Sequence, residues 1–390
     1  MPDSDFGTFD AVSVHLLEDA AVLYDRSRRS LFAANMNAAT IWLGLEQKVR
    51  PREVAEALAE EFGIERGIAR QHVASTLLQW RRWCREAALR DASGGVGPRG
   101  RGQCLPFSPA APAERHTYRL LDTVFAIQYG HNVPHWSVRP VFEYLGCDTA
   151  AGTERVIDIV RFGEGFAIAE SGYLHRKCAA ASQLASVMRD LMTESAINDS
   201  RGLAALQAAA VERNGTCILM PGKPGVGKSC LAAALAADGF TLLGDENVVL
   251  SGGEHSIRPL PFGLCIKDSP PAMLWDRFPG LAERAVHMRP DGTHVHYLTP
   301  PEIAIAPAAH RARVERIVFP RYFPGGETEL IPIGNGNALQ RMLSCFSPLG
   351  DSMNRRDIEA LVAWVAATPC YALHVSSLCE AVRILRRFGT

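Results

Sequence analysis

The sequence of 390 residues lacks the features that would place it in a membrane or on nucleic acid. No apolar run approaches the roughly eighteen residues that a membrane helix needs. The start, MPDSDFGTFD, is acidic and has no apolar signal core. The formal net charge is −1, so no strongly basic surface is indicated. These absences predict a soluble, cytoplasmic protein with no membrane partner.

The sequence also lacks metal-binding cysteine spacings, internal repeats and, outside one segment, low-complexity tracts. None of the ten cysteines forms a C-x-x-C pair, and most lie in apolar runs such as those around Cys217 and Cys265. We therefore expect buried, reduced thiols. The exception is residues 91–114, DASGGVGPRGRGQCLPFSPAAPAE. This composition predicts a flexible linker between a domain at 1–90 and another at 115–390.

Residues 1–90 have the pattern of a small α+β module. Three β-rich runs, AVSVHLL, AVLYDRS and SLFAAN, are separated by polar turns at 18–19 and 27–29. They predict a small antiparallel sheet.

Three helical stretches follow these strands. We predict them at 37–47, with Asn37 as the cap, at 51–62, ended by Gly63, and at 65–88. Three strands and three helices together predict a winged-helix-like fold.

A complete phosphate-loop motif lies in the second domain. The run GKPGVGKS matches G-x-x-x-x-G-K-[ST] at every fixed position. It follows a predicted strand, GTCILM, and precedes a predicted helix ended by Gly239, so bound phosphates would meet a helix N-terminus. Lys228 would reach the outer phosphates, and the Ser229 hydroxyl would hold Mg²⁺. The predicted nucleotide contacts are Gly222, Lys223, Pro224, Gly225, Val226, Gly227, Lys228, Ser229 and Cys230.

Two acids, Asp245 and Glu246, follow the loop closely. The run FTLLGDENVVL predicts a strand, a tight turn and a second strand, which places both acids at a strand end, where ligands gather in α/β sheets. An acidic hairpin tip in water is the alternative, but the complete phosphate loop favours a catalytic pair. One acid can organise a metal while the other accepts a proton from an attacking hydroxyl, and a kinase needs both functions.

Over residues 215–250 the chain resembles the core of HPr kinase/phosphorylase. A weaker resemblance to the HPr-kinase-related branch extends from about residue 115 to the end, through IRPLPFGLCIK and RVERIVFPRYFPGG. It implies an α/β P-loop kinase core of the HPr kinase/PEP carboxykinase type, with ATP and Mg²⁺ as cofactors and a possible homo-oligomer. Asp245 matches the acid that deprotonates the acceptor hydroxyl. Glu246 matches the metal-side acid, where the family usually has Asp.

One position departs from the resembled family. Relatives carry a histidine in a pattern like L-H-A-A, whereas this chain has Gln207 there. Glutamine can keep a hydrogen bond but cannot carry a proton. The departure puts proton handling in doubt, above all for the reverse, phosphorolytic reaction. The predicted catalytic residues are Asp245, Lys228 and Gln207, and the predicted metal ligands are Ser229 and Glu246.

Three further side chains are weaker candidates. Lys267 is either a phosphate or substrate contact or a solvated strand-end lysine. His294 and His296 would share one strand face, but no third ligand accompanies them.

The N-terminal module resembles the PqqD family, the leader-peptide recognition domain of ribosomal peptide modification. The resemblance rests on the VLYD strand and on Asn37 and Trp42 in NMNAATIW, two residues that also suit a helix cap and a core anchor. It implies that a leader peptide binds between residues 30–35 and 65–85, adding as an extra strand.

DNA binding by the winged helix is the alternative, along with a purely structural role. The third predicted helix carries five arginines and a histidine, but five glutamates lie close by in sequence, so nucleic acid is a less favoured partner. The residues are Arg66, Arg70, His72, Arg81, Arg82 and Arg85, and Glu53, Glu56, Glu60, Glu61 and Glu65.

Together these features predict an ATP-dependent kinase that phosphorylates a Ser or Thr hydroxyl of a ribosomally made precursor peptide. Two alternatives stay open. One is a kinase of a small-molecule hydroxyl. The other is a non-catalytic, nucleotide-sensing regulator with a DNA- or partner-binding winged helix.

Overall fold

The computed structural model of the protein describes residues 12–16, 20–25, 30–92, 112–148, 153–252, 256–349 and 353–389. Contacts divide the chain into two compact units. The first unit is Met1–Arg99 with Ile333–Ser344 and Ser352–Cys370, and the second is Gly100–Pro332 with Cys345–Asp351 and Tyr371–Thr390. Within the described ranges, no helix has both the length and the apolar character to cross a bilayer.

The first unit is built on a three-stranded antiparallel sheet, as the β-rich runs predicted. Its strands, β1 (Val12–Leu16), β2 (Ala20–Asp25) and β3 (Ser30–Asn35), lie in the order β1-β2-β3. The predicted turns at 18–19 and 27–29 lie outside the described residues.

Three helices follow the sheet close to their predicted bounds, namely α1 (Met36–Glu46), α2 (Pro51–Glu61) and α3 (Arg66–Ala92). The cap of α1 was predicted wrongly: Asn35, not Asn37, accepts the Ala38 N–H at 2.9 Å. Asn35 has the extended backbone that a cap requires, and Asn37 already lies inside the helix. Trp42 and Trp80 join α1 to α3 in the core, with ring centroids 4.9 Å apart in an edge-to-face contact.

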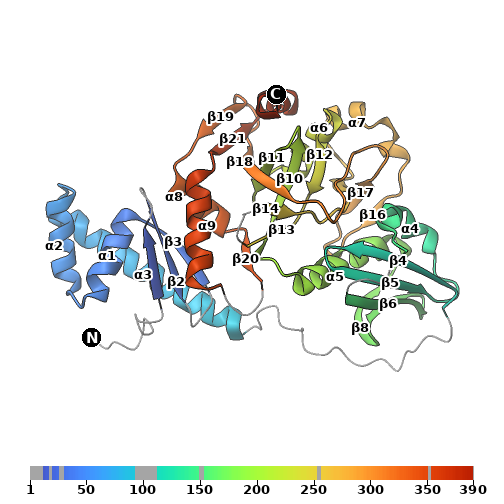
Figure 1. Cartoon of the computed structure of the whole chain (residues 1–390), viewed down its shortest axis with the longest axis horizontal. Coiled ribbons are helices and arrows are strands. Elements are labelled where there is room, and N and C mark those ends of the chain that lie inside the picture. Colours follow the sequence, from blue (N-terminus) through green and yellow to red (C-terminus); the bar gives the residue numbers. More distant parts are fainter. Residues whose placement is uncertain are drawn as a thin grey trace. The chain divides into compact units, whose positions relative to one another are not determined.

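Two helices from far along the chain complete the first unit. Helices α8 (Asn335–Leu343) and α9 (Arg355–Ala367) pack on the sheet, α8 against β3 and α9 against β1. Figure 1 shows α9, in red, beside the blue strands. Every residue of β2 is therefore buried. The sequence had placed both helices in the domain at 115–390, and the contacts group them instead with the N-terminal module.

A buried hydrogen bond ties the N-terminal sheet to the segment before α9: the Tyr24 hydroxyl donates to the Met353 carbonyl at 2.7 Å. We expect Tyr24→Phe to lower the free energy of unfolding by about 1 kcal/mol, because it leaves a buried carbonyl without its donor. Urea unfolding of the full chain measures this. The matched control is Tyr173→Phe on an exposed tyrosine. Equal stability of both variants would contradict the docking of this segment.

The second unit contains three sheets. A five-stranded sheet runs in the order β4-β5-β6-β7-β8, and a three-stranded sheet in the order β15-β17-β16. The strands of these two sheets are β4 (Glu114–Leu120), β5 (Thr123–Tyr129), β6 (Thr153–Phe162), β7 (Gly165–Glu170), β8 (Tyr173–Cys178), β15 (Leu264–Lys267), β16 (His287–Met288) and β17 (His294–Leu298).

The third sheet has ten strands and carries the phosphate-loop motif. Its main path is β12-β10-β11-β18-β14-β13-β9-β20, and β21 joins it by pairing with β18 and β19. Its strands are β9 (Ala204–Leu206), β10 (Ala208–Arg213), β11 (Thr216–Pro221), β12 (Thr241–Gly244), β13 (Val248–Leu250), β14 (Ser256–Arg258), β18 (Ala312–Tyr322), β19 (Glu329–Pro332), β20 (Phe346–Pro348) and β21 (Cys370–Val375).

Helices cover these sheets and enclose two apolar clusters, one centred on the five-stranded sheet and one around the helix after the phosphate loop. The helices are α4 (Arg139–Phe142), α5 (Leu184–Asp199), α6 (Lys228–Ala237), α7 (Ala272–Arg277) and α10 (Leu378–Arg386). The predicted linker at 91–114 overlaps the end of α3 and the first residue of β4. Its residues 93–111 lie outside the described ranges.

Candidate functional site

The phosphate-loop motif folds as a strand, a loop and a helix. Strand β11 ends at Pro221, residues 222–227 form the loop, and α6 begins at Lys228. Gly225 and Gly227 have φ of 89° and 99°, a left-handed conformation that strains other residues. The fixed glycine Gly227 is therefore required by the backbone, as the motif implies. This geometry turns the first N–H groups of α6 toward the loop, the arrangement that favours an anion.

Lys228 lies over the loop rather than in solvent, and only 7% of it is exposed. Its Nζ donates to the Gly222 carbonyl at 2.6 Å and to the Lys223 carbonyl at 2.9 Å. Burial lowers the pKa of this ammonium, against the opposing pull of Asp245 and Glu246. Phosphate oxygens would compete with the two loop carbonyls for the same donor.

Asp245 is buried at the end of β12, with 2% of its surface exposed. The acids follow β12 as predicted, and the alternative of a hairpin tip is wrong: β12 pairs with β10, whereas β13 pairs with β9 and β14. The two strands therefore diverge and the acids do not form a tip in water.

The two oxygens of Asp245 have different surroundings. Oδ2 accepts the Cys265 N–H at 3.0 Å. Oδ1 is buried, and among the described residues no hydrogen bond of standard geometry reaches it. Burial and the neighbouring Glu246 raise the pKa of Asp245, although Arg189 and the Ser229 hydroxyl act in the opposite direction. A carboxylate with a raised pKa and one unpaired oxygen is suited to accept a proton.

Glu246 is held by two arginines that the sequence did not single out. Arg289 Nη1 lies 2.6 Å from Oε1, and Arg189 Nε on α5 lies 3.7 Å from Oε2. Burial alone would raise the pKa of Glu246, but the two guanidinium groups outweigh it and lower that pKa below its ordinary value. Both carboxylate oxygens therefore face cations.

Arg189 is almost fully buried and serves several partners at once. Its Nη1 donates to the Gly263 carbonyl at 2.7 Å, and its guanidinium lies over the rings of Phe262 and Tyr297. No sequence signal marked it, because an arginine in a helix ordinarily belongs to the wet face. Its contacts, such as those with Glu246 and Tyr297, come from about sixty to a hundred positions further along the chain, so only the fold brings them together.

Gln207 connects the acids to the loop through its backbone. Its carbonyl accepts the Gly222 N–H at 3.1 Å, and its own N–H donates to the Cys345 carbonyl at 2.8 Å. The next residue, Ala208, donates to the Glu246 carbonyl at 3.2 Å. In the described part of the chain, the Gln207 side chain makes no hydrogen bond to Asp245. The residue therefore lies at the predicted place, and its side-chain role stays a prediction.

The weaker candidates take ordinary positions. Lys267 is exposed at the end of β15, near enough to Cys230 to affect the thiol. His296 is buried and shares a 2.9 Å hydrogen bond with Asp268, whereas His294 is exposed. Among the described residues no group of three or more His, Cys, Asp or Glu side chains could hold a metal.

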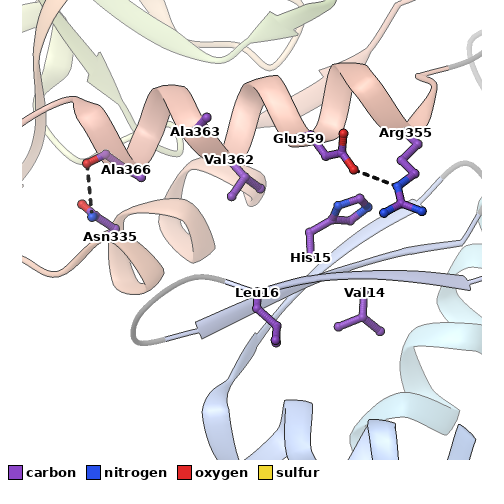
Figure 2. Close-up of a pocket in the computed structure, with 9 residues that line it drawn as sticks. All are labelled: Val14, His15, Leu16, Asn335, Arg355, Glu359, Val362, Ala363 and Ala366. Atoms are coloured by element: carbon purple, nitrogen blue, oxygen red, sulfur yellow. Dashed lines mark hydrogen bonds and ion pairs between the residues drawn. The ribbon is translucent and has the colours of Figure 1, made fainter.

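A separate cavity of about 690 Å³ lies in the first unit, between β1 and helices α8 and α9. Figure 2 shows the His15 ring directed toward α9, beside the ion pair of Arg355 and Glu359. Because the cavity needs residues more than 300 positions apart, no local sequence pattern could reveal it. The predicted peptide groove uses a different edge of the sheet, at β3 and α3.

One family model matches residues of the first unit. Residues 20–82 match the family model of coenzyme PQQ synthesis protein D (PqqD). This stretch contains β2, β3, α1, α2 and most of α3, so the resemblance of this part of the chain to PqqD is confirmed, and peptide recognition by it stays a prediction.

A solved structure, TbiB1 in complex with the TbiA(beta) leader peptide, is similar at 24% identity and a TM-score of 0.17. The match covers 21% of this chain and 87% of that chain. No curated protein matches the chain.

Proposed function

We propose that the protein is an ATP-dependent kinase that phosphorylates a Ser or Thr hydroxyl of a ribosomally made precursor peptide. The PqqD-like domain would hold the leader of that peptide. The proposed kinase activity is supported mainly by one observation, a phosphate loop with a buried carboxyl group, Asp245, close to it. Lys228 and Ser229 open α6, and the Ser229 hydroxyl lies near enough to Asp245 to oppose the rise that burial causes in the pKa of that carboxyl.

The proposed reaction uses few protein groups. The acceptor hydroxyl oxygen attacks the γ-phosphorus, the bond to the β–γ bridging oxygen breaks, and ADP leaves with that electron pair. The hydroxyl proton passes to Asp245. The loop N–H groups and Lys228 stabilise the charge on the phosphoryl oxygens, so catalysis is mainly positioning and electrostatics.

The residues around the loop fit Mg²⁺, with one change from the sequence-based assignment. Mg²⁺ prefers oxygen ligands. The Ser229 hydroxyl would supply one and the phosphates of the nucleotide would supply others, whereas Asp245 Oδ1 is left as the proton acceptor. Because both oxygens of Glu246 face arginines, we assign Glu246 to positioning Arg189 and Arg289 instead. When bound, Mg²⁺ would neutralise phosphate charge.

The peptide half of the proposal rests on the PqqD-like domain. Strand β3 is an edge strand of its sheet, and Leu78 on α3 is 62% exposed. An extended peptide can add to such an edge, gaining backbone hydrogen bonds there and side-chain contacts on the helix. Holding the leader would raise the effective concentration of the attached core peptide at the phosphate loop.

We expect a leaderless core peptide to be phosphorylated about 10²-fold more slowly than the full precursor at dilute substrate, because tethering is lost. The rates are measured with labelled ATP and precursors encoded by short reading frames beside the gene. The deficit should shrink at high peptide concentration. Added free leader should inhibit phosphorylation of the full precursor and leave the leaderless reaction unchanged.

The alternatives predict other outcomes. Equal rates for both peptides would contradict leader recognition, and labelling of a small hydroxyl compound alone would favour the small-molecule kinase. The peptide should be truncated rather than the enzyme. Deleting residues 1–90 would expose the faces of α8 and α9 that pack on the sheet and would confound recognition with stability.

A further inference from the structure

An exposed aromatic side chain stands beside the phosphate loop. A Cβ built on Gly227 would lie 3.9 Å from Tyr322 Cβ, yet Tyr322 is 61% exposed. Strand β18 pairs with β11 in parallel through Leu219 and Ile317. Beyond that pair β11 has two residues left and β18 has five, so β18 extends past the start of the loop.

The backbone that follows Tyr322 is held by hydrogen bonds and packing. The next residue, Phe323, donates its N–H to the Val375 carbonyl on β21 at 2.9 Å and packs on His374, with ring centroids 5.6 Å apart. Gly326 lies against the Phe323 ring, where any side chain would collide with it. Thr328 Oγ1 accepts the N–H groups of Ser376 and Ser377. The segment is therefore packed in place while the Tyr322 ring remains accessible.

We propose that the Tyr322 ring is the stacking platform for the base of the nucleoside triphosphate, an inference that rests on the proposed kinase function. An accessible aromatic ring costs free energy in water unless something covers it, and every nucleobase offers a complementary face. The contact sets base affinity. It does not take part in the transfer itself.

The order of the strands supports the base as the occupant rather than the acceptor peptide. Asp245 follows β12, which lies on the β10 side of β11, whereas Tyr322 ends β18, on the opposite side of β11. A triphosphate held by the loop between them has two ends. Its γ-phosphate must face the acid that receives the proton, so its base end is directed toward Tyr322.

The test compares Mg-ATP with Mg-tripolyphosphate, which has the phosphates but no base. For Tyr322→Ala we expect ATP to bind about tenfold more weakly, the order that base–aromatic stacking contributes. Tripolyphosphate affinity should not change. Tyr322→Trp should keep ATP affinity. Tyr173→Ala, which removes an exposed tyrosine from β8, is the matched control and should bind both ligands normally. Calorimetric titration gives all these affinities.

Three results would overturn the inference. Equal weakening of ATP and tripolyphosphate would make Tyr322 a support for the loop. Unchanged ATP affinity with a raised KM for the peptide would place the acceptor on Tyr322. If the unmodified protein binds neither ATP nor tripolyphosphate, the proposed nucleotide site is wrong. This outcome distinguishes failure of the proposed function from failure of the stacking role of Tyr322 alone.

Discussion

Lys228→Ala should abolish nucleotide-dependent phosphoryl transfer and weaken ATP binding. Lys228 is the cation fixed over the loop, with its Nζ on two loop carbonyls and its carbon chain buried. Charge spreads over the phosphoryl oxygens in the transition state, so a preorganised ammonium is worth more there than in water. We expect transfer to fall by at least about 10²-fold, the order seen when one such donor is removed.

The loop offers its own control. Lys223 carries the same charge in the same loop, but its side chain is exposed and only its carbonyl contacts Lys228. Lys223→Ala removes this side chain and keeps the backbone N–H by which Lys223 is predicted to contact phosphate, so it should keep most of the activity. Transfer rates and ATP affinities are measured for both variants, with thermal unfolding as a check on the fold. If both variants lose activity equally, general attraction to phosphate rather than a specific lysine position would explain the loss.

Local patterns were sufficient to predict the elements that depend on local chemistry. The β-rich run SLFAAN coincides with β3, and the strand and helix predicted on either side of the phosphate-loop motif are β11 and α6. Gly63 has a φ of 61° and lies directly after the C-cap of α2, so it ends the helix as predicted. The cap of α1 was missed by two positions because Asn35 and Asn37 are equally suited by residue type, and backbone conformation decides between them.

Features that depend on distant contacts could not be predicted. Helices α8 and α9 have ordinary amphipathic patterns, and nothing in them tells which sheet they cover. Likewise, the residue pattern alone did not assign separate roles to Asp245 and Glu246, which only the family resemblance distinguished as base and metal-side acid. The structure separates them, because Arg189 and Arg289 come to Glu246 while burial dominates at Asp245. Long-range charges and burial, which a sequence pattern does not encode, decide these roles.

Asp245→Asn should keep ATP binding and lose phosphoryl transfer. The amide has nearly the same shape and can still accept the Cys265 N–H, so the strand end should keep its geometry. It cannot take the hydroxyl proton, and a positioned acid or base contributes about 10²- to 10⁴-fold to rate. Glu246→Gln is the matched variant, because it removes the neighbouring charge and leaves Asp245 ionisable. It should lower the rate of phosphoryl transfer less than Asp245→Asn does.

The pH dependence gives a second readout of the same role. A base must be deprotonated to act, so transfer should decline as pH falls through the pKa of Asp245. Burial and Glu246 raise that pKa above its ordinary value of 3.8, so the decline should begin at a higher pH than for an ordinary aspartate. Removing the charge of Glu246 lowers the pKa of Asp245, so Glu246→Gln should move the acid limb to lower pH. The residual activity of Asp245→Asn should lack that limb. If Asp245→Asn keeps the rate and the acid limb of the unmodified enzyme, the proton has another acceptor and Asp245 is not the base.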